Sequence, residues 1–134
     1  MKVLVIGGTG HIGRFLTPML VQSGHEVVVL TSGRTPLPDD AGDWASVAAA
    51  RASYTRNGSD WRELVASLKA DVVIDILGAD LRTLYDTVRY TCKHLLACGS
   101  IWMFGDPQTV PTPDETQTPC RFDGYTWRYA EMLK

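Results

Sequence analysis

Residues 3–13 read VLVIGGTGHIG, and this stretch decides the fold. The apolar run 3–6 predicts a short strand that is buried on both faces. The glycines end that strand, and a helix is expected over residues 11–22. The large apolar side chains of this helix fall at helical spacing on one face, which is expected to be buried: Ile12, Phe15, Leu16, Met19 and Leu20. Strand, glycine-rich turn and helix in this order are typical of the opening of a βαβ unit.

The rest of the chain repeats the alternation. Further strands are expected at 27–30, within 48–55, at 72–77 and from 94 onward. Further helices are expected from about 60 to 69, at 81–90 and from near 124, with exposed loops at 31–46 and 105–123. Strands that alternate with helices indicate a parallel, doubly wound sheet. The sequence therefore predicts a Rossmann-type α/β fold in a single domain over residues 1–134.

The glycines at positions 7, 10 and 13 form a candidate phosphate loop, because they lie between a strand and a helix. The first permits a tight turn, the second lets a pyrophosphate approach the backbone, and the third lets helix and strand pack closely. The helix N-terminus adds open N–H groups and the positive end of its dipole. The alternative is a structural turn that binds nothing. The residues predicted to bind the cofactor here are Gly7, Thr9, Gly10, His11, Ile12 and Gly13.

The end of the second strand indicates which dinucleotide is bound. An acidic residue at this position binds the ribose hydroxyls of NAD, whereas this sequence reads Thr31-Ser32-Gly33-Arg34. Arg34 can pair with a 2′-phosphate, and Thr31 or Ser32 can donate a hydrogen bond to it. These residues favour NADP as the cofactor, with NAD as the second choice. The alternative is that Arg34 is a solvated loop charge.

The glycine spacing, and the segment GTGHIG at residues 8–13 in particular, resembles the opening motif of the short-chain dehydrogenase/reductase superfamily. The similarity is to its extended or atypical branch, which is related to the NAD-dependent epimerases and dehydratases. The resemblance implies that Asn57 or Gly58 lines the adenine site and that Leu77 and Gly78 pass the cofactor ribose. The resemblance covers nearly the whole chain, although the family normally continues into a C-terminal substrate-binding region.

The resemblance also implies catalytic positions. Residues 98–105, CGSIWMFG, are similar to the segment that carries the family's catalytic serine, which Ser100 would provide. Tyr125 takes the place of the tyrosine in the Y-x-x-x-K motif. A tyrosine there transfers the proton at the reacting oxygen, and the serine holds that oxygen. Tyr129 stands where the lysine belongs, and Arg128 on a neighbouring part of the helix face is the candidate substitute.

Two functions follow from these positions. The first is an NAD(P)-dependent epimerase, dehydratase or reductase that acts on a hydroxyl or carbonyl substrate such as a nucleotide sugar. The alternative is a non-catalytic dinucleotide-binding module or sensor, which the replacement of the lysine by Tyr129 supports. A homodimer is compatible with the resemblance, because extended relatives often dimerise.

Composition and charge exclude several other classes. A net charge of -2 and a pI near 5.8 give no basic field for nucleic acid or for an anionic membrane. The sequence has no signal-peptide layout, and its three cysteines form no metal or disulfide pattern. We therefore expect a cytoplasmic protein with free thiols, no metal site and no membrane or nucleic-acid partner. Asp75 interrupts an apolar strand and is expected to be a pairing or positioning group, without an assigned partner.

Overall fold

The computed structural model describes residues 1–38 and 42–99 of the 134-residue chain. Apart from Gly99, these residues belong to one compact unit, Met1–Cys98. The expected loop at 105–123, the expected helix from 124 and the catalytic candidates lie outside them, so the single domain over the whole chain stays a prediction. None of the helices described has the length and apolar character needed to cross a bilayer.

Short apolar runs form the strands, as expected for the interior of a parallel sheet. The strands are β1 (Lys2–Ile6), β2 (Glu26–Thr31), β3 (Ala48–Arg51), β4 (Val72–Asp75) and β5 (His94–Ala97). The helices are α1 (Gly13–Gln22), α2 (Asp60–Leu68) and α3 (Leu81–Val88), together with the short 3-10 helix η1 (Gly42–Ser46). The helix η1 lies inside the stretch expected to be a loop, and its Trp44 packs against the buried valines of β1 and β2.

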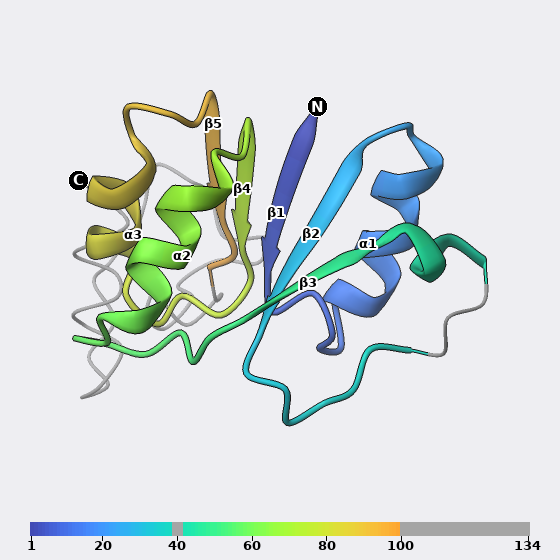
Figure 1. The fold of residues 1–134 in the computed structure, drawn as a ribbon, viewed down its shortest axis with the longest axis horizontal. Helices are drawn as coiled ribbons and strands as arrows, with labels where there is room; N and C mark the ends of the chain where they lie inside the picture. The colour runs from blue at the N-terminus through green and yellow to red at the C-terminus, as the bar shows by residue number, and fades with distance from the viewer. Residues whose placement is uncertain (39–41, 100–134) are drawn as a thin grey trace, which may run out of the picture. The chain divides into compact units, whose positions relative to one another are not determined.

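The strands form one sheet in the order β3-β2-β1-β4-β5, and all neighbours are parallel. Figure 1 shows α1 on one side of the sheet and α2 and α3 on the other. Alternate side chains of β1 enter two separate cores: Leu4 and Ile6 pack toward α2 and α3, and Val3 and Val5 pack toward the side of α1. The predicted Rossmann-type α/β fold is therefore confirmed.

The order of the strands reverses between β1 and β4. From β1 the chain runs to β2 and then to β3 at one edge of the sheet. It then crosses to the other side of β1, where β4 and β5 follow. In open α/β sheets the loops diverge at such a switch point and leave a crevice at the carboxyl ends of the strands. We therefore expect a ligand site between the loops after β1 and β4.

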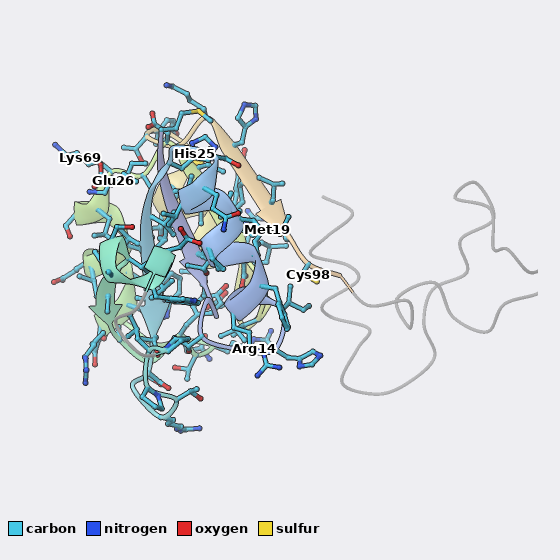
Figure 2. All side chains as sticks on the ribbon, turned by 90° about the vertical axis from the view of Figure 1, so that its right-hand side faces the viewer. Arg14, Met19, His25, Glu26, Lys69 and Cys98 are labelled. Atoms are coloured by element: carbon cyan, nitrogen blue, oxygen red, sulfur yellow. The ribbon has the colours of Figure 1, made fainter. Side chains whose placement is uncertain are left out.

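The helix α1 begins later than the sequence pattern predicts and buries a different face. Its buried residues are Gly13 and Thr17. Three side chains that were expected to be buried are 51%, 60% and 62% exposed: Ile12, Phe15 and Met19. Figure 2 shows Met19 on the outer side of α1. The helix lies so close to the loop after β1 that only small side chains fit between them, and this turns the larger apolar residues outward.

Candidate functional site

The loop between β1 and α1 packs backbone against backbone. Gly7 has a φ of +86°, a left-handed conformation that favours glycine, and its carbonyl accepts a hydrogen bond from the N–H of Gly10 at 3.0 Å. A Cβ atom on Gly13 would lie 2.5 Å from the Cα of Gly8, so no side chain fits between α1 and the loop. Gly7 and Gly13 therefore have the geometry expected for the first and third glycines of a dinucleotide loop.

The first turn of α1 leaves backbone donors open. Within the described residues, no group accepts a hydrogen bond from the backbone N–H of His11, Ile12 or Gly13. No side chain caps the helix, and its first turn has no acidic residue. Figure 2 shows Arg14 at this end of the sheet and Lys69 at the opposite end. The open donors, the helix dipole and Arg14 together favour an anion such as a phosphate at this place.

A cavity of about 320 Å³ opens at the carboxyl ends of β1, β2, β3 and β4. Its volume lies within the usual range of small-molecule pockets, about 300–1,000 Å³. The lining residues are Gly7, Thr9, Gly10, Leu30, Thr31, Ser32, Arg34, Thr35, Ala52, Ser53, Tyr54, Thr55 and Leu77. The glycine loop and the end of β2 therefore border one hollow, at the switch point of the sheet.

Two arginines stand beside the end of β2. Arg34 lines the cavity. Arg51, the last residue of β3, lies against Gly33, because a Cβ atom on Gly33 would be 3.5 Å from its Nη1 atom. The N–H of Gly33 donates to Thr31 Oγ1 at 3.1 Å, which holds the turn. Among residues 1–38 and 42–99, no carboxylate forms an ion pair with either arginine. The two guanidinium groups therefore bring positive charge to the turn after β2.

Tyr54 stands in the wall of the cavity and donates its hydroxyl hydrogen to Asp75 Oδ2 at 2.8 Å. Burial raises the pKa of Tyr54 well above its usual range, and the nearby charge of Asp75 raises it further. The hydroxyl therefore keeps its proton and stays a donor to Asp75. Tyr54 is thus a partner of Asp75 that the sequence pattern left unassigned.

The cavity collects seven of the predicted cofactor-binding residues: Gly7, Thr9, Gly10, Thr31, Ser32, Arg34 and Leu77. The others lie outside its lining: His11, Ile12, Gly13, Asn57, Gly58 and Gly78. The backbone N–H groups of Asn57 and Gly78 instead donate to the carboxylates of Asp80 and Asp75. Direct contact of all these residues with a cofactor stays a prediction. The candidates Ser100, Tyr125 and Arg128 lie outside the described residues.

Sequence reasoning missed the edge of the cavity that follows β3, where residues 52–55 line the wall. The strand β3 reads AAAR and has little hydrophobic signal, so its carboxyl end could not be located. The available signal was positional, because residues that directly follow a parallel strand lie at the ligand edge. Within the described part of the chain, no three His, Cys, Asp or Glu side chains gather as a metal site.

Comparison with protein families places the fold and loop in a known group. The sequence profile of the NAD dependent epimerase/dehydratase family matches residues 3–90. This chain belongs to that family. The match spans the glycine loop and every residue that lines the cavity. The predicted relationship to the epimerase/dehydratase-like short-chain dehydrogenases, and the prediction of a family member built on an NAD-binding domain, are therefore confirmed.

Two curated proteins are similar in sequence. The chain is 36% identical over 87 residues to the chloroplast stem-loop binding protein of 41 kDa b from Arabidopsis thaliana, across 59% of this chain and 23% of that protein. It is 30% identical over 123 residues to the 2′-dehydrokanamycin reductase of Streptomyces kanamyceticus, across 89% of this chain and 33% of that protein. The chain thus spans a third or less of the length of these relatives.

Solved structures of two enzymes share the fold. The Bordetella bronchiseptica enzyme WbmG, in complex with NAD and UDP, superimposes with a TM-score of 0.73 at 21% identity, over 99% of this chain and 48% of that chain. The UDP-Glc/GlcNAc 4-epimerase of Campylobacter jejuni gives 0.70 at 18% identity, over 98% and 46%. The chain spans about half of each of these enzymes.

Proposed function

We propose that this chain binds NADP in preference to NAD, as the cofactor-binding part of an epimerase, dehydratase or reductase. One observation carries the proposal: a single cavity joins the glycine loop to an end of β2 that has an arginine and no carboxylate. In support, the NAD complex of WbmG shows that a protein of this fold holds a nicotinamide dinucleotide.

The preference for NADP is supported by the charges beside β2. The pyrophosphate would lie at the N-terminus of α1, and the adenosine half would lie between the ends of β2 and β3. A 2′-phosphate on that ribose would meet the guanidinium groups of Arg34 and Arg51 and the hydroxyls of Thr31 and Ser32. Charge-assisted hydrogen bonds of this kind are about twice as strong as neutral ones. NAD lacks the 2′-phosphate and would gain none of them.

The proposed chemistry rests on residues after β5, by resemblance to the family. A bound nicotinamide supplies or accepts a hydride at a carbon that bears a hydroxyl or carbonyl group. Ser100 would hold the substrate oxygen, and Tyr125 would give or take its proton. With Tyr129 in the place of the lysine, Arg128 would supply the positive charge near Tyr125, although an arginine cannot relay a proton.

The proposed substrate is a small molecule with a sugar hydroxyl or carbonyl group, such as a nucleotide sugar. The names of the similar proteins support this class, since they include a 2′-dehydrokanamycin reductase and a UDP-sugar 4-epimerase. The name of the chloroplast relative refers to stem-loop binding, but the net charge of -2 argues against nucleic acid as a partner of this chain. We further propose a homodimer in the cytoplasm, where Cys92 would stay a free thiol.

Calorimetric titration of the 134-residue chain with NADP, and separately with NAD, tests cofactor binding. We expect saturable binding of both, with NADP at least about tenfold tighter, as one net charge-assisted interaction predicts. Binding of neither dinucleotide by a chain with folded circular dichroism would contradict the proposal. Equal affinities would contradict only the preference for NADP.

Turnover distinguishes an enzyme from a non-catalytic module. NADPH oxidation with keto-sugar substrates should be abolished by Tyr125→Phe and raised by Tyr129→Lys, which restores the family's lysine. If the native protein binds NADP tightly, shows no turnover and gains none from Tyr129→Lys, the module is the correct function.

A further inference from the structure

A buried carboxylate stands behind the cavity without lining it. Asp75 ends β4 and has no exposed surface. Its donors include the hydroxyl of Tyr54 at 2.8 Å on Oδ2, and the backbone N–H groups of Leu77 and Gly78, each at 2.9 Å on Oδ1. Burial of a carboxylate is costly unless hydrogen bonds compensate for the lost water. These hydrogen bonds therefore compensate the Asp75 carboxylate for the water that it loses on burial.

The hydroxyl of Tyr54 extends this network to a second carboxylate. It accepts a hydrogen bond from the backbone N–H of Asp80 at 3.1 Å. The side chain of Asp80 accepts in turn from the N–H of Asn57 at 3.2 Å, and from the N–H of Thr83 at 3.3 Å in the first turn of α3. The network thus ties the loop after β3 to the loop after β4.

Both of these loops contribute walls of the cavity, through Tyr54 and Leu77. The turn at Leu77 and Gly78, which donates to Asp75, places Leu77 against the glycine loop. A Cβ atom on Gly7 would lie 2.9 Å from Leu77 Cγ. The ring of Tyr54 is held edge-on by buried Trp61, with ring centroids 4.8 Å apart. One carboxylate therefore accepts hydrogen bonds from two residues that line the same hollow, Tyr54 and Leu77.

We propose that Asp75 is a positioning residue for the dinucleotide site, and that it acts through Tyr54 and Leu77 to hold the adenosine half of the cavity open before the cofactor arrives. This inference rests on the proposed function. Asp75 touches no ligand, because it is fully buried behind the wall. Its contribution is preorganisation, which raises affinity by removing the cost of ordering the loops during binding.

Tyr54→Phe is the first test, because it keeps the ring and its contact with Trp61 and removes only the bridging hydroxyl. We expect its dissociation constant for NADP to rise about five- to tenfold, the equivalent of roughly one net hydrogen bond. Adenosine 2′,5′-bisphosphate, which carries only the adenosine half, should show the full loss. Tyr85→Phe is the matched control, since Tyr85 is 49% exposed on α3.

A second control separates positioning from general stability. Val65→Ala removes a buried side chain of α2 that takes no part in the network, and it should lower the urea midpoint at least as much as Tyr54→Phe. Its NADP affinity should stay within about twofold of the wild type if only global stability changes, because both folded states are fully populated in buffer.

Asp75→Asn is the second variant, alone and combined with Tyr54→Phe. Both changes act on the same hydrogen bond, which Tyr54→Phe removes and Asp75→Asn deprives of its charged acceptor, so the double variant should lose less affinity than the product of the single losses. The proposal is overturned if folded Tyr54→Phe binds NADP as tightly as the wild type, or if Val65→Ala weakens binding equally. If Asp75→Asn fails to fold, Tyr54→Phe still decides. If the wild type binds no dinucleotide, the proposed function is wrong, and the role of Asp75 falls with it.

Discussion

The Cα atom of Gly8 lies 2.5 Å from the position that a Cβ atom on Gly13 would occupy. This separation is shorter than any normal carbon–carbon contact, so α1 meets the loop after β1 through backbone atoms alone. Neither partner is a flexible side chain that can move away. The contact therefore fixes how close the N-terminus of α1 comes to the carboxyl end of β1, and with it the position of the open N–H groups.

Gly13→Ala is expected to destabilise the fold by about 3 kcal/mol, the upper end of the usual cost of overpacking, because the methyl group meets only backbone. Urea unfolding followed by circular dichroism measures the loss. Arg14→Ala on the same helix is the control, since its side chain is exposed and should change stability by no more than about 0.5 kcal/mol. A Gly13→Ala midpoint equal to that of the wild type would show that the helix can move outward.

Gly10→Ala should lower cofactor affinity more than stability, unlike Gly13→Ala. A Cβ atom here would lie 3.2 Å from the carbonyl oxygen of Gly7 and would otherwise project into open space, so we expect a stability loss below about 1 kcal/mol. Gly10 lines the cavity, and a methyl group would occupy the place where a pyrophosphate approaches the backbone. Calorimetry should therefore show NADP affinity reduced by at least about tenfold. Unchanged affinity would place the pyrophosphate elsewhere.

The fold could be predicted from the sequence because its signals are local. The run at residues 3–6 and the glycines after it mark the first strand and its turn without any information from distant residues. The second and fourth strands, at residues 26–31 and 72–75, contain equally continuous apolar runs, at residues 27–30 and 72–74. Their alternation with helices then leaves few topologies, because crossovers between parallel strands are right-handed.

The parts that could not be predicted depend on contacts between distant segments. The buried face of α1 is set by how closely the helix approaches Gly8. The spacing of apolar residues along the helix carries no information about this distance. The pairing of Tyr54 with Asp75 joins residues 21 positions apart, one in the loop after β3 and one at the end of β4, and the sequence located both of these strand ends only loosely. Arg51 was missed for the same reason, since it lies against Gly33 only because β3 pairs with β2.

Asp71 should make stability depend on pH in the acid range. Its carboxylate accepts from the backbone N–H of Lys2 at 2.9 Å and pairs with Lys93 Nζ at 3.0 Å. The hydrogen bond from Lys2, followed by the interaction with Lys93, lowers the pKa of Asp71 below its usual value of 3.8. A carboxyl group whose pKa is lower in the folded state stabilises the fold fully above its unfolded pKa, and this is lost as pH falls through the folded pKa.

Asp71→Asn is therefore expected to unfold at lower urea than the wild type at pH 7. The difference between the two midpoints should shrink as the pH is lowered below 3.8, because the wild-type carboxylate becomes protonated. Urea titrations between neutral pH and strong acid measure this difference. A gap that stays constant across the range would show that shape and hydrogen bonding, rather than charge, account for the contribution of Asp71.

The two arginines beside Gly33 should separate NADP from NAD. Arg34→Met and Arg51→Met keep the length of each side chain and remove its charge, so each should raise the dissociation constant for NADP by about tenfold or more. Neither should change the affinity for NAD by more than about twofold, because no 2′-phosphate is present to lose a contact. Arg82→Met is the matched control, since Arg82 lies exposed on α3 and pairs with Asp86. Parallel losses for both dinucleotides would instead assign the arginines to the shape of the loop, and an unchanged NADP affinity would remove them from the site.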